Sequence, residues 1–87
     1  MHNKKYIVEK IDELRRHNPI HEGLEGKICY IAYLNKGERG WVLCDSGELF
    51  DPPHRLHTSE IRDIAYGDGQ VVVTTMYTKY VFKEIAG

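Results

Sequence analysis

The chain has 87 residues, enough for one small domain, and its 12 lysines and arginines nearly balance its 13 aspartates and glutamates. This balance counts against non-specific binding to DNA or RNA, which usually needs a basic excess or a clustered basic face. No apolar run approaches the roughly 18 residues of a membrane span, and the first residues lack the apolar core of a signal peptide. We therefore expect a cytoplasmic protein that does not engage a membrane.

Residues 3–17 carry the spacing of an amphipathic helix. Ile7, Ile11 and Leu14 fall at i, i+4 and i+7, which places them on one narrow apolar stripe. The asparagine–proline pair that follows would end the helix, because the residue before a proline avoids helical backbone angles. We predict a helix over 3–17, followed by a linker over 18–26.

The pattern changes to strands after the linker, and residues 27–86 are β-rich. Ile61 and Ile64 are three residues apart, so a β-bulge near Arg62 and Asp63 is needed to turn both side chains inward. Alternating apolar residues, bounded by glycine-containing turns, predict strands over 27–34, 40–45, 58–66, 70–76 and 78–85, with a short edge strand over 48–50.

These elements predict a single α+β domain over residues 1–87, in which an N-terminal amphipathic helix precedes about five antiparallel strands. A strongly bent sheet or small barrel would cover two apolar sheet faces with few residues and would leave few exposed edges. The order of elements resembles that of small Sm-like and Src-homology-3-like barrels. The RNA-binding signatures of the Sm family are absent, so the resemblance implies an architecture and not an RNA function.

The segment from Phe50 to Ser59 concentrates residues that are suited to recognition. Its two prolines fix φ and remove two backbone donors, so we expect a stiff loop and not a central strand. Its guanidinium, imidazole and hydroxyl groups could contact a phosphate. The aromatic residues that could supply a flat surface for a base are Trp41, Tyr30, Tyr33, Tyr77 and Tyr80. The candidate binding residues are Trp41, Asp51, His54, Arg55, His57, Thr58, Ser59, Tyr77 and Tyr80.

The tip between the last two expected strands is unusual. A two-residue hairpin turn normally needs glycine or asparagine at its centre, whereas this one offers Met76 and Tyr77. Either the loop is longer than two residues, or a bulky aromatic side chain is held exposed at the tip. In the second case the tip and the Asp51–Ser59 loop would form a small apolar patch with a polar rim.

Metal and catalytic sites have weaker support in the sequence. Cys29 and Cys44 lie in apolar segments and lack the close spacing of zinc motifs. Cys44, His57 and Asp51 are the residue types of a thiol–imidazole–carboxylate relay, but burial makes a thiol a poor nucleophile. We expect both cysteines to pack in the core as free thiols, and we expect no enzymatic activity, metal or cofactor.

In its size, its helix-plus-meander organisation and its Thr58-Ser59, Thr74-Thr75 and Tyr80 pattern, the chain resembles short accessory proteins of phages and mobile elements, including inhibitors of host defence. The resemblance implies occlusion or sequestration rather than turnover. We expect a non-enzymatic binding module that blocks a host protein. The alternatives are sequestration of a small nucleotide or phosphorylated ligand, in one chain or between copies of a homo-oligomer, and an Sm-like RNA- or DNA-binding module, which the charge balance disfavours.

Overall fold

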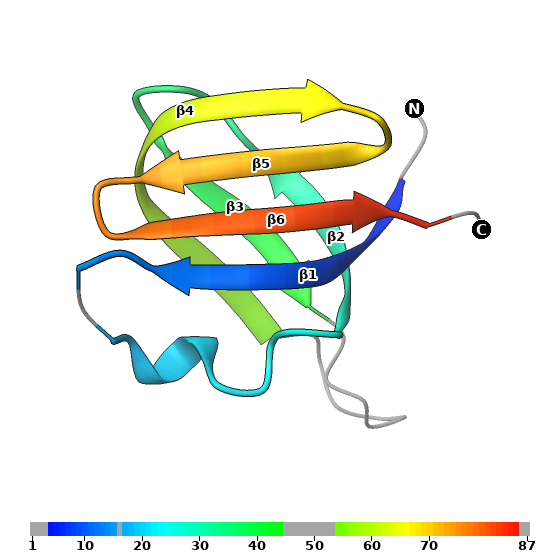
Figure 1. The fold of residues 1–87 in the computed structure, drawn as a ribbon, viewed down its shortest axis with the longest axis horizontal. Helices are drawn as coiled ribbons and strands as arrows, with labels where there is room; N and C mark the ends of the chain where they lie inside the picture. Colours follow the sequence, from blue (N-terminus) through cyan, green and yellow to red (C-terminus); the bar gives the residue numbers. More distant parts are fainter. Residues whose placement is uncertain (1–3, 16, 45–53, 86–87) are drawn as a thin grey trace.

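The computed structural model describes residues 4–15, 17–44 and 54–85. These residues form six antiparallel strands that close into a barrel, with one short turn of 3-10 helix, η1, between the first two strands (Figure 1). No helix in this part of the chain has the length and apolar character needed to cross a membrane. The elements are β1 (Lys5–Glu13), η1 (Pro19–His21), β2 (Ile28–Tyr33), β3 (Arg39–Cys44), β4 (His54–Gly67), β5 (Gln70–Thr75) and β6 (Thr78–Glu84).

Each strand pairs with the next one along the chain, and β1 pairs with β6 to close the ring. β4 has 14 residues because it serves both halves of the barrel: residues 54–60 pair with β3, and residues 61–67 pair with β5. Its two halves lie in the rear and front layers of Figure 1. The change of layer coincides with a register shift between Ile61 and Asp63, which confirms the predicted bulge.

The interior of the barrel is apolar and closely packed. Val71, Val73 and Thr75 alternate inward on β5, as the sequence predicts for a strand with one buried face. On β6 the Tyr80 and Phe82 rings stack at 6.1 Å between centroids, with their planes 10° apart. The buried hydrophobic residues are Val8, Leu24, Cys29, Val42, Cys44, Leu56, Ile61, Val71, Val73, Tyr80 and Phe82.

The predicted α+β class is wrong, since Lys5–Glu13 forms strand β1 and the described residues of the range 3–17 contain no helix. Of the three residues on the expected stripe, only Ile11 packs against the core, because Leu14 is 54% exposed and Ile7 lies outside the core cluster. Tyr6 and Val8 contact the core with the two-residue period of a strand, and the register shift after Val8 then brings Ile11 to the core three residues later. Because β1 pairs on both sides, with β2 and β6, its backbone pairing outweighs a modest helix propensity.

The prediction that a stiff loop extends as far as Ser59 is also wrong, because strand β4 already begins at His54. The two prolines, at positions 52 and 53, lie outside the described residues. The short strand expected over 48–50 lies outside the described residues. The linker over 18–26 contains η1 and packs the side chains of His21 and Leu24 against the barrel.

Candidate functional site

The outer surface of β2, β3 and β4 carries two rows of side chains that stand opposite one another across the strands. Directly opposed residues of antiparallel strands project from the same side of the sheet, so each row forms a continuous strip. We call these six residues the aromatic face: the first row is Tyr33, Trp41 and His57, and the second row is Tyr30, Leu43 and Arg55.

The large side chains of this face are exposed to solvent. Tyr30, Tyr33 and Trp41 have exposed fractions of 39%, 46% and 41%, respectively. Ile28, the first residue of β2, is also exposed. Four of the seven exposed large hydrophobic residues in the described ranges therefore lie on β2 and β3. Single exposed apolar residues are ordinary, but neighbouring ones form a patch that is typical of a contact surface.

Two contacts hold the aromatic rings of the first row. The Trp41 and His57 rings lie 4.1 Å apart between centroids, with their planes inclined by 60°. The Tyr33 hydroxyl donates to the Glu38 carboxylate, which also accepts a hydrogen bond of 2.7 Å from the Asn35 amide. The bond between Tyr33 and Glu38 raises the pKa of Tyr33 and lowers the pKa of Glu38. The tyrosine ring is therefore anchored at its polar end, with its flat body still exposed.

The second row continues onto β1, where Lys5 stands opposite Tyr30. A single row across four strands therefore runs from an exposed lysine through an aromatic and an apolar side chain to the exposed Arg55. It has a cation at each end and contains no carboxylate. A partner that carries acidic groups on either side of an apolar contact would complement this row.

A small cavity of about 40 Å³ lies beside the aromatic face and shares His57 with it. Such a volume holds one or a few water molecules and is far too small for a nucleotide. The cavity brings together residues from β4, from the β5–β6 hairpin and from the segment around η1. Its lining consists of Asn18, His21, His57, Ser59, Tyr77, Thr78 and Tyr80.

The β5–β6 hairpin is built without a positive φ at Met76 or Tyr77. The Thr75 hydroxyl organises the turn instead: it accepts hydrogen bonds from the Tyr77 and Thr78 amides at 3.1 and 3.0 Å and donates to the Thr78 carbonyl at 3.2 Å. Side-chain hydrogen bonds of this kind can stabilise a turn that lacks the glycine usually needed for a positive φ. The turn leaves Met76 exposed and holds Tyr77 half-buried against the cavity.

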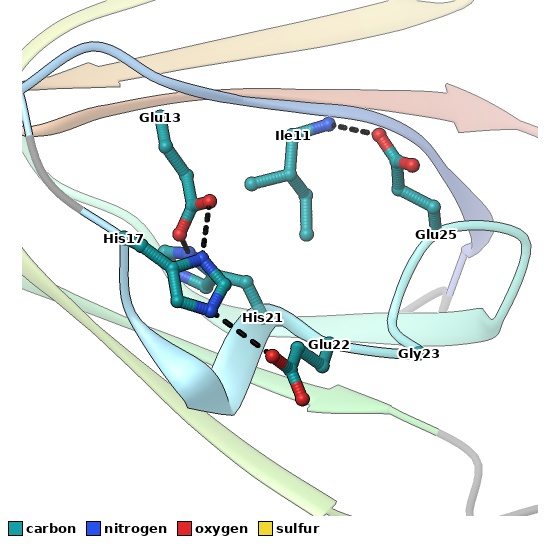
Figure 2. A pocket seen from close by; sticks show the side chains of 7 residues that line it. All are labelled: Ile11, Glu13, His17, His21, Glu22, Gly23 and Glu25. Atoms are coloured by element: carbon teal, nitrogen blue, oxygen red, sulfur yellow. Dashed lines mark hydrogen bonds and ion pairs between the residues drawn. The ribbon is translucent and has the colours of Figure 1, made fainter.

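A histidine network connects the end of β1 to η1 and to the barrel interior (Figure 2). One carboxylate, that of Glu13, contacts the Nδ1 atoms of His17 at 2.8 Å and His21 at 2.9 Å, and it accepts a hydrogen bond of 2.6 Å from the Asn18 amide. His17 also contacts Glu22 at 3.1 Å. These contacts lower the pKa of Glu13 to about 2, with the Asn18 hydrogen bond as the largest cause.

The inner end of this network is the hydroxyl of Tyr80, 2.8 Å from Nε2 of His21. Carboxylate, imidazole and hydroxyl in series resemble a catalytic relay. However, Tyr80 is only 3% exposed, and burial raises its pKa to about 12. A phenol that keeps its proton inside the barrel is a poor nucleophile, so the geometry favours a structural role: the network fastens η1 beneath the barrel.

Another surface feature is an open groove of about 450 Å³, formed by the segment that follows β1, by one residue of β4 and by the start of the β5–β6 turn. Its backbone is fixed because the Leu14 amide donates to the Tyr77 carbonyl at 2.7 Å and Nε of Arg15 donates to the Met76 carbonyl at 3.1 Å. The groove combines two guanidinium groups with exposed apolar side chains. We call it the arginine groove, lined by Leu14, Arg15, Arg62, Thr75 and Met76.

The structure brings several of the sequence-predicted binding residues together. Trp41, Arg55 and His57 belong to the aromatic face, and the cavity adds Ser59, Tyr77 and Tyr80 through their common neighbour His57. Arg55, His57 and Ser59 share the outer side of β4 because they alternate with inward residues.

One predicted binding residue that the structure describes, Thr58, does not join that face. Thr58 is fully buried, where its hydroxyl accepts a hydrogen bond of 2.8 Å from the Gly40 amide and donates to the Ser59 carbonyl at 2.7 Å. Asp51 lies outside the described residues, as does the side chain of His54, whose backbone begins β4 opposite Cys44.

Sequence reasoning missed Lys5 and the histidine network. Lys5 was assigned to a helix, so its place opposite Tyr30 could not be foreseen. His21 meets Tyr80 across 59 residues of sequence, and no local pattern signals such a contact. The close succession of Glu13, His17 and His21 was the one available clue, because three residues with complementary hydrogen-bonding groups recur every four positions.

The described residues contain no group of three or more histidine, cysteine, aspartate or glutamate side chains that could hold a metal ion. Comparisons of the chain with protein-family models, with curated proteins and with solved structures give no match.

Proposed function

We propose that the chain is a small non-enzymatic binding module that uses the aromatic face to cover an acidic surface on a protein partner. The row from Lys5 through Tyr30 and Leu43 to Arg55 carries this proposal. Tryptophan, tyrosine and arginine contribute most of the energy at protein interfaces, because they bury a large area and keep a polar end. The flanking cations would orient an acidic partner during encounter.

The barrel favours contact through side chains. Each strand of the described barrel pairs with two neighbours, so the barrel presents less unpaired strand edge than an open sheet does. A rigid sheet with anchored rings loses little conformational entropy on binding. A module of this kind acts by covering a surface, as expected of a phage or mobile-element accessory protein that blocks a host protein.

Charge favours a protein partner over RNA or DNA. The aromatic face and Lys5 together hold two full positive charges, and the chain as a whole has a formal net charge of −1. Nucleic-acid binders usually neutralise several phosphates at once, which requires more cations than this face supplies. The flat rings alone could stack on bases, so nucleic acid is kept as an outcome of the test.

Site-specific photocross-linking in the cells that make the protein tests the proposal. A benzoylphenylalanine replaces Tyr30 on the aromatic face, and the matched control replaces Tyr66, which is 71% exposed on β4 and lies outside that face. We expect one protease-sensitive adduct from position 30, none from position 66, and loss of the adduct when Arg55→Glu is added.

The other results would count against the proposal. Equal adducts from both positions would show a non-specific surface, and no adduct from position 30 would remove the aromatic face as a contact site. A nuclease-sensitive adduct whose yield falls steeply with salt would replace the protein partner with RNA or DNA.

The arginine groove favours a second candidate function, the binding of a small phosphorylated ligand. Arg15 and Arg62 line it without a carboxylate, its volume of about 450 Å³ suits a small molecule, and Leu14 and Met76 offer apolar contact. With ATP as the probe, this candidate predicts a melting temperature that rises with ATP concentration and does not rise in Arg62→Ala. An unchanged melting temperature in wild-type protein at millimolar ATP would remove it.

A further inference from the structure

Cys29 and Cys44 face each other across β2 and β3. They are direct register partners, both are fully buried, and both are free thiols. Opposed residues on antiparallel strands have Cα atoms about 4.5 or 5.5 Å apart. Disulfides span Cα separations of about 4.4–6.8 Å. The backbone therefore already holds the two cysteines at a distance that a disulfide can bridge.

The two thiols are chemically unequal. The hydrogen bond between them raises the pKa of Cys29, with burial adding to the effect, and it lowers the pKa of Cys44 against the opposing effect of burial. Cys44 is also the last residue of β3, so we take its sulfur as the attacking thiolate once the strand end opens.

We infer that Cys29 and Cys44 form a reversible dithiol–disulfide pair, with a small soluble disulfide such as glutathione disulfide as the oxidant. The Cys44 thiolate attacks one sulfur of glutathione disulfide, and the S–S bond breaks to release one glutathione thiolate. The Cys29 thiol then loses its proton and attacks Cys44 in the mixed disulfide, which releases the second glutathione. The protein pair loses two electrons and two protons, and one glutathione disulfide becomes two thiols.

Access to the buried pair requires only local opening. Cys29 is the second residue of β2 and Cys44 is the last residue of β3, so both stand at strand ends. Strand ends open at a lower free energy than the whole barrel does. The new bond would join β2 and β3 beside Tyr30 and Leu43 of the aromatic face, and its formation does not depend on what that face binds.

Oxidation of the folded wild-type protein tests this inference. The protein is incubated with glutathione disulfide, free thiols are blocked with N-ethylmaleimide, and the intact mass is measured before and after dithiothreitol. We expect a monomer that has lost two hydrogen atoms, takes up no N-ethylmaleimide, and melts about 5 °C or more above the reduced form. Dithiothreitol should reverse each change.

Single-cysteine variants provide the control for the two chemical steps. In Cys29→Ser the resolving thiol is missing, so the mixed disulfide with glutathione should persist at Cys44. Three results would overturn the inference: oxidation of wild-type protein only in denaturant, a persistent mixed disulfide in wild-type protein, or disulfide-linked dimers as the main product. Because all three are read by mass and not by partner binding, they are separate from a failure of the proposed function.

Discussion

Trp41 and His57 occupy directly opposed positions on β3 and β4, and their rings lie 4.1 Å apart between centroids on the outside of the barrel. His57 also lines the small cavity beneath the β5–β6 hairpin. The pair therefore joins the aromatic face to the predicted binding residues Ser59, Tyr77 and Tyr80. Because Trp41 and His57 are exposed, a mutation there tests binding, whereas a mutation of a buried residue tests the stability of the fold.

Replacing Trp41 with alanine should change stability only slightly. Its ring is exposed, and a cross-strand pair such as Trp41 with His57 contributes roughly 0.2–1 kcal/mol. Urea denaturation followed by far-ultraviolet circular dichroism should therefore show a loss of about 1 kcal/mol or less, with an unchanged m-value. A loss above about 3 kcal/mol would assign Trp41 to the core.

Replacing Phe82 with alanine should be far more damaging. Phe82 is fully buried and stacks on Tyr80, so its removal leaves a cavity that costs about 3–5 kcal/mol. A chain of 87 residues usually has a total stability of roughly 4–13 kcal/mol. We expect a large fall in the urea midpoint, while Tyr66→Ala, on an exposed side chain, should leave it almost unchanged.

Thr58→Val tests the buried hydroxyl on β4. Valine keeps the shape of the side chain but leaves the Gly40 amide without its 2.8 Å hydrogen bond inside the barrel. The expected cost is about 1–3 kcal/mol. Thr74→Val on the half-buried side of β5 is the matched control and should cost less. Equal effects of the two substitutions, measured by urea denaturation, would contradict the structural role of Thr58.

The histidine network predicts a stability maximum in weakly acidic solution. Glu13 has its pKa lowered from 4.5 to about 2, so its contribution is complete above pH 4.5 and is lost as the pH falls toward 2. His17 has its pKa raised above 6.5, chiefly by its hydrogen bond to Glu13, so its contribution is complete below pH 6.5 and is lost as the pH rises through the folded-state pKa. Both contributions are complete between pH 4.5 and 6.5.

Melting temperatures measured across this pH range check the prediction. Glu13→Gln removes the charged acceptor for both histidines, so it should lower the melting temperature and flatten its dependence on pH on both sides of the maximum. Glu60→Gln, at an exposed position on β4, should preserve the wild-type profile. Parallel profiles for wild-type protein and Glu13→Gln would show that the network does not govern the pH response.

The strands of the second half of the chain could be predicted from two local patterns. Alternation on β5 indicates a strand with one buried face, and the Ile61–Ile64 spacing indicates a β-bulge. The N-terminal strand could not be predicted in this way. In the N-terminal segment, Ile7, Ile11 and Leu14 have a helical spacing although only Ile11 packs against the core, and the bulge after Val8 interrupts the alternation of the residues that do face inward. Pairing with β2 and β6 makes this segment a strand, and such pairing depends on the closed barrel and not on the local sequence.

The candidate site was predictable in its residue types but not in its arrangement. Trp41, Arg55 and His57 were chosen for their chemistry, and strand register then places them on one face. The same register puts Lys5 at the end of that row. Thr58 shows the opposite case: a hydroxyl suited to recognition points inward, because alternation along β4 places it between two outward residues.

The aromatic face is tested most directly by its effect on affinity. The partner cross-linked at position 30 is purified and titrated by calorimetry against wild-type protein, Trp41→Ala and Tyr66→Ala. A side chain at the centre of an interface contributes about 2 kcal/mol or more, so Trp41→Ala should weaken Kd by roughly 30-fold or more. Tyr66→Ala should bind as tightly as wild-type protein does. Equal affinity for all three proteins would contradict the assignment of the contact surface to β2, β3 and β4.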